Sequence, residues 1–111
     1  MITLTVAECS DKYGFEPITL PDGARDIDGC YIGDLLSWVM GRAKSGNIWI
    51  TIMSNINIVA VATLADVSCV ILAEGVTIDD DVKSAASAKG INILSSSLTA
   101  YETAVAVSNG L

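Results

Sequence analysis

The sequence feature that most constrains the fold is the stretch from Asn47 to Val67. It begins with the β-branched and aromatic run Ile-Trp-Ile-Thr-Ile, continues through a polar turn at Ser54-Asn55, and ends in an almost wholly apolar run of helical length. The first part is typical of a buried strand. A helix that is apolar nearly all round, as at 56–64, must be covered on more than one side. One cover is a sheet, and the other is a neighbouring helix or a second subunit.

The same strand-then-helix order repeats toward the C-terminus. A continuous apolar run at 68–73 predicts a strand buried on both faces. Acidic residues at 79–81 open the next helix, which ends at Lys89-Gly90. A strand at 91–94 and a helix at 99–108 follow, the helix opened by a capping box of Thr99 and Glu102. Strands joined by helices in this order form a parallel sheet with right-handed crossovers.

The N-terminal part adds a helix and an extended segment. Thr5 and Glu8 form a capping box that predicts a short helix over 6–13. The run at 15–20 is extended, and Pro17 within it indicates an edge strand. We therefore predict an α/β fold in three layers, with a mainly parallel sheet of about five strands flanked by helices.

Between these parts lie a weak extended run at 26–32 and a helix that we expect to begin at Gly33-Asp34. Its apolar residues fall on one side at helical spacing. They are Leu35, Leu36, Val39 and Met40. Trp38 lies between the directions of Leu35 and Met40, so it belongs either to the core or to a partner surface. Trp49, in the central strand, is expected in or near the core.

Length and composition predict one domain spanning residues 1–111. Apolar residues make up 51% of the chain and aromatic residues 5%, so the core must be built from Val, Ile, Leu and Ala. The longest apolar run, 58–62, is far short of the roughly 20 residues that a membrane span needs. The N-terminus lacks a basic segment followed by an apolar one, so we expect no signal peptide and a cytoplasmic protein.

The net charge of −7 excludes two classes of partner. Nucleic acid binding needs a basic face, and the six basic residues are scattered along the chain. Binding to anionic membranes is disfavoured for the same reason.

No metal or cofactor site is expected. The three cysteines Cys9, Cys30 and Cys69 are far apart, no CxxC pair exists, and the chain has no histidine. Their apolar settings favour structural roles for all three. Neither a GxGxxG nor a GxxxxGK[ST] motif is present.

No catalytic set is apparent either, and we do not expect an enzyme. Asp34 and Glu74 follow extended or apolar runs and could line one cleft. The favoured interpretation is that Asp34 is the partner of a helix dipole and that Glu74 is a turn residue. A serine nucleophile would need a base, and no Ser-x-x-Lys motif is present.

Candidate ligand-binding residues lie in the turns after the strands. Ligands of open parallel sheets bind beyond the carboxyl ends of the strands, and free amides at helix N-termini can hold a phosphate or carboxylate. The candidates are Ser54, Asn55, Glu74, Gly75, Ser96, Ser97 and Thr99. The favoured alternative is plain capping, because Ser, Asn and Thr are the preferred N-cap residues of any helix.

The stretch from about Gly29 to Ala104 resembles the DRTGG domain, a family of stand-alone domains that also occurs as a module in larger proteins. The likeness rests on the order and spacing of five apolar motifs. They are Tyr31-Ile32-Gly33-Asp34-Leu35-Leu36, Trp49-Ile50-Thr51-Ile52, Asn57-Ile58-Val59-Ala60-Val61-Ala62, Ile71-Leu72-Ala73-Glu74-Gly75, and Gly90-Ile91-Asn92-Ile93-Leu94 with Thr99-Ala100-Tyr101-Glu102.

The resemblance implies an α/β domain that often self-associates and has a regulatory or interaction role without catalysis. Two departures from the family pattern weaken an inherited anion site. The turn before the central helix, Ser54-Asn55, has no basic residue, and Glu74-Gly75 stands where relatives tend to have Gly-Gly. The naming pentapeptide Asp-Arg-Thr-Gly-Gly is also absent.

Two hypotheses follow for the function. The first is a non-enzymatic regulatory or protein-interaction module, forming a homodimer through Trp38, Ile56 and Val59. The alternative is a sensor that binds a nucleotide or phosphorylated metabolite at the carboxyl ends of the strands.

Overall fold

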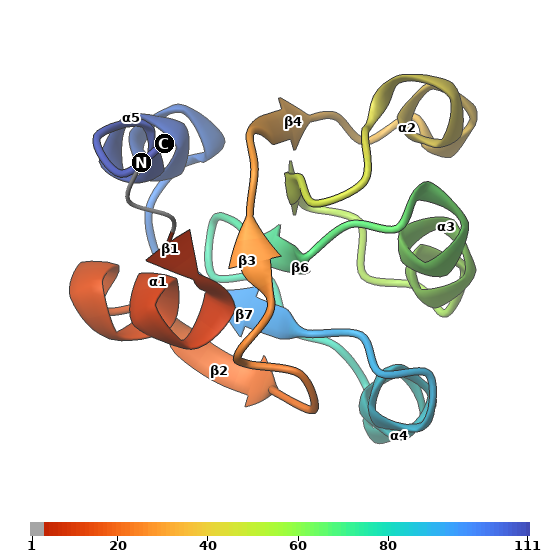
Figure 1. Ribbon diagram of the computed structural model, residues 1–111. Coiled ribbons are helices and arrows are strands. Elements are labelled where there is room, and N and C mark those ends of the chain that lie inside the picture. Colours follow the sequence, from red (N-terminus) through yellow and green to blue (C-terminus); the bar gives the residue numbers. More distant parts are fainter. Residues whose placement is uncertain (1–3) are drawn as a thin grey trace.

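A computed structural model describes residues 4–111, which form three layers with a sheet in the middle (Figure 1). The sheet has five strands, and this confirms the predicted fold class. A separate two-stranded sheet pairs β1 (Leu4–Thr5) with β3 (Asp26–Ile27). The strands of the main sheet are β2 (Glu16–Thr19), β4 (Cys30–Ile32), β5 (Ile48–Thr51), β6 (Cys69–Leu72) and β7 (Ile93–Ser95).

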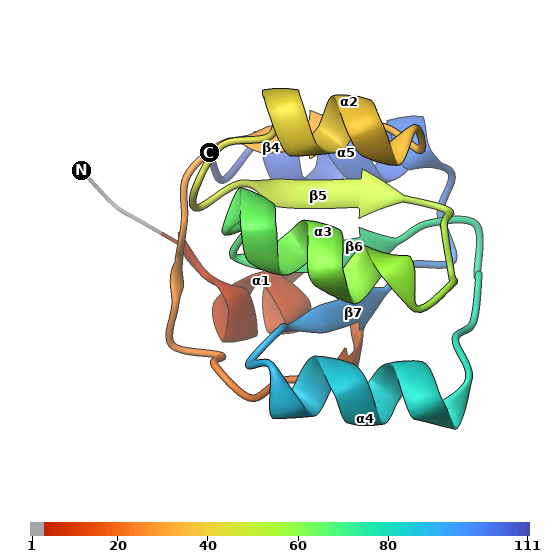
Figure 2. The same cartoon turned by 90° about the vertical axis from the view of Figure 1, so that its right-hand side faces the viewer.

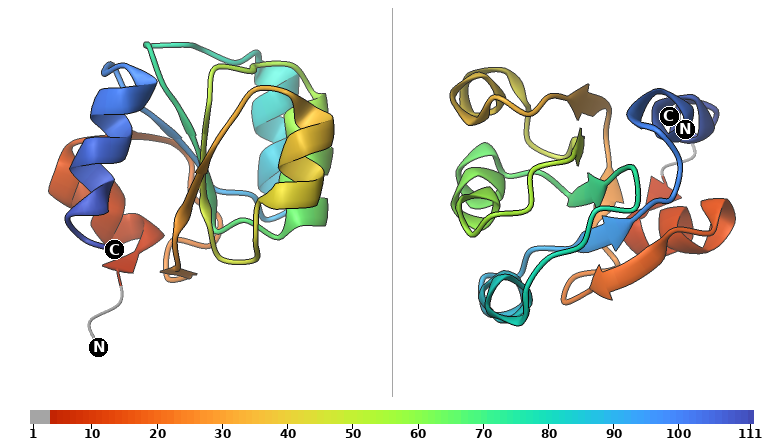
Figure 3. Two further views of the ribbon diagram at one scale, coloured as in Figure 1. Left: turned by 90° about the horizontal axis from the view of Figure 1, so that it is seen from above. Right: turned by 180° about the vertical axis from the view of Figure 1, so that it is seen from behind.

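The helices divide between the two faces of the main sheet, as the view from above shows (Figure 3). One face is covered by α2 (Leu36–Arg42), α3 (Asn57–Ala65) and α4 (Asp80–Ala88). The other face is covered by α1 (Val6–Tyr13) and α5 (Ala100–Ser108). None of these helices, within residues 4–111, has the length and apolarity to cross a membrane.

The strand order is β2-β7-β6-β5-β4, so β2 and β4 form the two edges. The four strands from β4 to β7 are parallel, and β2 joins β7 in the antiparallel direction. The strand–helix units β5–α3, β6–α4 and β7–α5 appear in the predicted order. Pro17 lies in the edge strand β2, as predicted, because a residue without an N–H group fits only where no neighbour needs that donor.

Alternation along the strands builds two cores. Trp49, Val70 and Leu72 contact the layer of α2, α3 and α4. Residues of the opposite parity, such as Ile48 and Ile71, contact α1 and α5. Trp49 is fully buried, as expected, and its Nε1 donates to the carbonyl of Gly33 at 2.8 Å.

Both predicted capping boxes are present. Thr5 accepts from the amide of Glu8 at 3.2 Å, and the carboxylate of Glu8 accepts from the amide of Thr5 at 3.0 Å. The pair of Thr99 and Glu102 does the same at the start of α5. Because each box satisfies two amides that a helix end leaves free, these boundaries could be read from the sequence.

The extended run predicted at 26–32 is two strands rather than one. Asp26–Ile27 pairs with β1, whereas Cys30–Ile32 pairs with β5. Gly29 lies between them at φ +80°, a conformation that favours glycine and turns the chain from one sheet to the other.

The prediction that a helix begins at Gly33-Asp34 was wrong by about two residues, because α2 begins at Leu36. Asp34 does not serve the helix; its carboxylate bonds the end of β5 instead. The predicted apolar side of α2 is also only partly buried. Val39 is fully buried, but Leu35 is 59% exposed and Met40 is 47% exposed.

The last strand is displaced from the predicted 91–94. It begins at Ile93 and extends one residue beyond the predicted end, to Ser95. The backbone of Asn92 still bonds β6, since its carbonyl accepts from the amide of Val70 at 2.9 Å, and its side chain bridges two other segments. Its Nδ2 donates to the carbonyls of Asp22 (2.8 Å) and Ser68 (2.9 Å), and its Oδ1 accepts from the amide of Asp22 at 2.9 Å.

The central helix α3 packs on the sheet and lies between α2 and α4 (Figure 2). Neighbouring helices of the same chain therefore supply its second cover. Its outermost residues remain open to solvent, and Leu64 is 74% exposed.

Candidate functional site

The three candidate turns lie at one end of the sheet, because β5, β6 and β7 are parallel. In Figure 2 the arrowhead of β5 and the starts of α3 and α4 lie at the same right-hand side. The structure thus brings the predicted ligand-binding residues together at the carboxyl end of the parallel strands. What they can bind depends on which polar groups there are still free.

The turn after β5 uses its own amides. The side chain of Asn55 accepts from the amide of Asn57 at 2.9 Å, and its carbonyl accepts from the amide of Ile58 at 3.2 Å. Ser54 is exposed. The helix-capping position is Ile56 rather than the predicted Ser54 or Asn55, although Asn55 satisfies the first helical amide. The amides of Asn57 and Ile58 are therefore not available to an anion.

The turn after β6 is held to the loop after β7. The amide of Glu74 donates to the carbonyl of Leu98 at 2.8 Å, and the amide of Gly75 donates to the carbonyl of Ser96 at 2.9 Å. Both residues are left-handed, with φ +61° at Glu74 and +67° at Gly75. This conformation is natural for Gly75 and strained for Glu74.

The turn after β7 is partly buried. The hydroxyl of Ser96 lies 2.8 Å from the hydroxyl of Thr103 and accepts from the amide of Leu98 at 3.1 Å. Ser96 is 2% exposed and Thr103 is fully buried, so this pair fixes the loop against α5. Ser97 is exposed, and the Thr99 side chain is used in its capping box.

The two acidic residues considered for catalysis have different settings. Asp34 accepts from the hydroxyl of Thr51 at 2.7 Å and from the amide of Ile52 at 3.0 Å. Glu74 is exposed. An acid–base pair needs two carboxyl groups with opposed pKa shifts, and the contacts of Asp34 are those of a structural link. This link was not predicted from the sequence, because Asp34 and Thr51 are 17 residues apart and their spacing matches no known motif.

The thiols are protonated at neutral pH. Burial raises the pKa of Cys9 to about 11, with a smaller contribution from Cys30, and burial raises the pKa of Cys69 well above its ordinary value. Cys30 is exposed, contrary to a purely structural role, yet desolvation of its thiol raises its pKa to about 11. A protonated thiol is a weak nucleophile and a poor metal ligand. Among residues 4–111 no cluster of three or more His, Cys, Asp or Glu side chains could hold a metal ion.

The candidate interface residue Trp38 is on the surface. Its side chain is 53% exposed, and the guanidinium carbon of Arg42 lies 3.9 Å from the centre of its ring. Such stacking is a cation–π contact that keeps a large aromatic group ordered at the surface.

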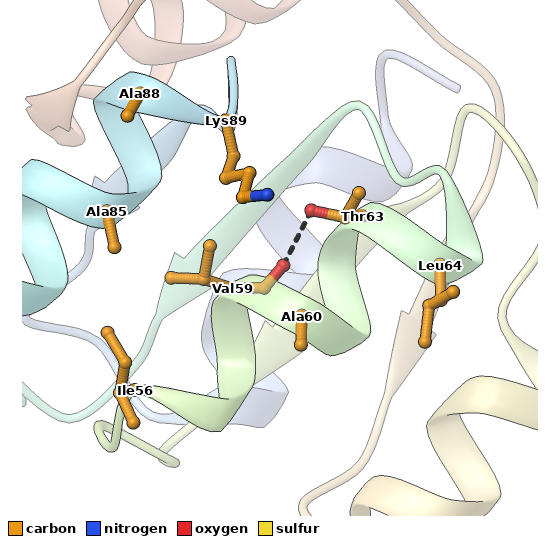
Figure 4. Close-up of a pocket in the computed structure, with 8 residues that line it drawn as sticks. All are labelled: Ile56, Val59, Ala60, Thr63, Leu64, Ala85, Ala88 and Lys89. Carbon is orange, nitrogen blue, oxygen red and sulfur yellow. Dashed lines mark hydrogen bonds between the residues drawn. The ribbon is translucent and has the colours of Figure 1, made fainter.

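The other two candidates line a groove between α3 and α4 (Figure 4). Ile56 is 46% exposed at one end, and Val59 is 5% exposed in its floor. The groove has a volume of about 500 Å³. Its remaining lining residues are Ala60, Thr63, Leu64, Ala85, Ala88 and Lys89. The side of the groove formed by α4 was not predicted from the sequence. Its small residues at 85 and 88 are three positions apart and so lie on the same face of the helix.

Comparison with protein families gives one match. The model of the DRTGG domain matches residues 31–109, which is more than half of the chain. No protein with a curated description matches.

Comparison with solved structures gives a similar fold. One match is the crystal structure of the CBS and DRTGG domains of the regulatory region of Clostridium perfringens pyrophosphatase, complexed with the activator diadenosine tetraphosphate. The TM-score is 0.79 at 15% sequence identity. The match covers 96% of the present chain but 47% of that chain, so the present chain spans about half of its length.

Proposed function

The chain belongs to the DRTGG domain family, and from this membership we propose that it is a regulatory or protein-interaction module without catalytic activity. We further propose that residues 1–111 form one domain of this family and that the domain associates with a second copy of itself. The similar Clostridium perfringens structure is described as a regulatory region, which supports the regulatory part of the proposal.

The observation that carries the interaction role is the exposed pair of Trp38 and Arg42. Trp and Arg are the residues most enriched at energetically important interface positions. Here the ring is half exposed and already ordered by the guanidinium group at 3.9 Å, so little side-chain entropy is lost on binding. A Trp side chain that only filled the core would be buried, as Trp49 is.

Sedimentation velocity from about 1 to 100 μM tests the self-association, since transient interfaces of standard size lie in this affinity range. We expect the sedimentation coefficient to rise with concentration. Tryptophan fluorescence gives a second reading, because Trp49 is buried in the monomer and only Trp38 can lose solvent on association. A concentration-dependent blue shift that disappears in Trp38→Phe is expected. A species that stays monomeric throughout would contradict self-association.

A second candidate function is a sensor for a nucleotide or a phosphorylated metabolite. It is favoured by the ligand of the similar structure, a dinucleoside tetraphosphate, and by the meeting of three turns at one end of the sheet. The proposed contacts are Ser54, Asn55, Glu74, Gly75, Ser96, Ser97 and Thr99. The many amides of these turns that already have partners make it the weaker of the two.

Calorimetric titration with diadenosine tetraphosphate, ATP and inorganic phosphate separates the two functions. A sensor would bind at least one of them, and Ser97→Glu would weaken binding by charge repulsion, whereas Leu64→Gln, on the distant outer side of α3, would not. If none of the three compounds gives a heat of binding and the sedimentation coefficient rises with concentration, the result would support the interaction module over the sensor.

A further inference from the structure

The two edges of the main sheet differ in how they are protected. The β2 edge contains Pro17, and its register with β7 shifts between Pro17 and Thr19. A proline and an irregular register are devices by which natural sheets prevent pairing with another chain. The β4 edge, Cys30-Tyr31-Ile32, is three residues long and has neither a proline nor a charged residue within it. An edge strand without these two devices is better suited to pairing than β2.

The hydrogen bonds of β4 indicate which of its groups face outward. The carbonyl of Gly29 accepts from the amide of Ile48 at 3.0 Å, and the amide of Gly33 donates to the carbonyl of Ile50 at 3.2 Å. In a parallel ladder, residues of one parity bond a given neighbour, so Gly29, Tyr31 and Gly33 face β5. Cys30 and Ile32 therefore turn their N–H and C=O groups away from the sheet.

This spacing is self-complementary. When two copies of β4 meet in the antiparallel direction about a two-fold axis at Tyr31, Cys30 of each copy lies opposite Ile32 of the other. Each such pair exchanges both N–H···O bonds. We propose that β4 pairs with β4 of a second copy in this register, joining the two sheets into one continuous sheet. The proposal rests on the proposed self-association and states where it occurs.

Exposed apolar side chains concentrate at the same edge. The two-fold axis is normal to the sheet, so it brings α2 next to α2 on one face and α5 next to α5 on the other. Figures 1 and 2 both place α2 and α5 beside β4. Of the twelve large apolar residues exposed within the described chain, six belong to β4, to α2 with its cap, or to α5. They are Ile32, Leu35, Trp38, Met40, Tyr101 and Val105. The opposite edge has Leu20 alone, just after β2.

The charge at this edge favours a second copy as the occupant. The chain carries a net charge of −7, so most of its surface repels another copy. In contrast, α2, β4 and α5 contain one basic residue, Arg42, and one acidic residue, Glu102. Two copies that meet through these three elements therefore add no net charge between them. The exposed residues Asp28 and Asp34 flank β4, and in the proposed register Asp28 of each copy lies opposite Asp34 of the other, so these two pairs oppose the association.

The first test compares two substitutions of isoleucine by lysine. Ile32→Lys adds charge at the β4 edge, and Ile56→Lys adds the same charge in the α3–α4 groove, at nearly equal exposure (48% and 46%). We expect Ile32→Lys to raise the dimer dissociation constant at least tenfold in sedimentation, with Ile56→Lys within twofold of the unmodified chain. The reverse pattern would overturn the edge proposal and assign the dimer to the groove. If the unmodified chain is monomeric, the proposed self-association itself is wrong.

The second test needs no substitution. Amide hydrogen exchange read by NMR distinguishes residues within β4, since Tyr31 donates within the chain and Cys30 and Ile32 donate outward. We expect the exchange of Cys30 and Ile32 to slow at least tenfold between dilute and concentrated samples, while Tyr31 stays protected in both. Equal exchange rates at both concentrations in a sample that sediments as a dimer would place the interface elsewhere.

Discussion

The carboxylate of Asp34 accepts a hydrogen bond of 2.7 Å from the hydroxyl of Thr51, the last residue of strand β5. The same carboxylate oxygen accepts from the amide of Ile52 at 3.0 Å. Asp34 thus fixes the loop between β4 and α2 to the point where the chain leaves the sheet. Because α2 and β4 are both attached to this loop, the position of Trp38 relative to the edge strand depends on it.

We predict that Asp34→Ala lowers the free energy of unfolding by about 1.5–3 kcal/mol, because bonds to a charged acceptor are stronger than neutral ones and the Thr51 hydroxyl is buried. Urea denaturation measures the change. Asp11→Ala is the matched control, since Asp11 is an exposed residue of α1, and a change within about 0.5 kcal/mol is expected. Equal effects at the two positions would show that the link contributes nothing specific.

The buried pair of Ser96 and Thr103 is expected to couple energetically. Thr103→Val removes one hydroxyl partner, whereas Ser96→Ala also deprives the amide of Leu98 of its acceptor. We therefore predict a larger loss for Ser96→Ala, with each loss on the order of 1–3 kcal/mol. The double variant should lose less than the two single losses added together, by about 1 kcal/mol in a double-mutant cycle. Strict additivity would contradict the pairing.

Replacing Glu74, whose backbone is in the left-handed conformation, by glycine should stabilise the protein. Glu74→Gly relieves a side-chain clash that costs about 1–2 kcal/mol, and part of this gain is offset by the greater freedom of glycine in the unfolded chain. We expect a net gain of about 0.5–1 kcal/mol by thermal unfolding. Asp66 is also left-handed, at φ +58°, but its carboxylate bonds Ser45 and Arg25. Asp66→Gly should therefore gain less or lose stability, and equal gains would refute this explanation.

The pKa of Asp66 is lowered, with the hydrogen bond from Ser45 as the largest single cause and the hydrogen bond and charge of Arg25 as further causes. A carboxyl group with a depressed folded pKa contributes stability above its unfolded pKa of about 3.9 and loses it as pH falls through the folded value. An NMR titration should give a midpoint below 3.8 for Asp66. Ser45→Ala and Arg25→Gln should each raise that midpoint. A midpoint that is unchanged in Ser45→Ala would assign the shift to the ion pair.

The central and C-terminal parts of the fold were the most predictable. The strand at 48–51, the helix after it and the capping box at Thr99 follow from local patterns that tertiary contacts reinforce. The errors lie where a distant contact decides. Asp34 bonds Thr51 rather than opening a helix, and the side chain of Asn92 bridges to Asp22. Neither partner is visible from sequence spacing.

The candidate sites were less predictable than the fold. The sequence predicted that the three turns lie together at the carboxyl end of the strands. It did not predict that the amides of Glu74 and Gly75 donate hydrogen bonds to the loop after β7. Trp38 was left open between core and surface, and its exposure depends on how α2 lies at the sheet edge. The outward direction of the N–H and C=O groups of Cys30 and Ile32 depends on which alternate residues bond β5. The composition of a three-residue strand does not show this.

The antiparallel pairing of β2 with β7 has a consequence for synthesis on the ribosome. The edge strand β2 is made well before its neighbour β7, and the contact between Asp22 and Asn92 spans 70 residues. At about 5–20 residues per second, the N-terminal segment waits roughly 4–14 s for its partner. The parallel strands can meet one another as they emerge, whereas β2 is the last to be placed. The N-terminal segment therefore closes a sheet that has otherwise been assembled in the order of translation.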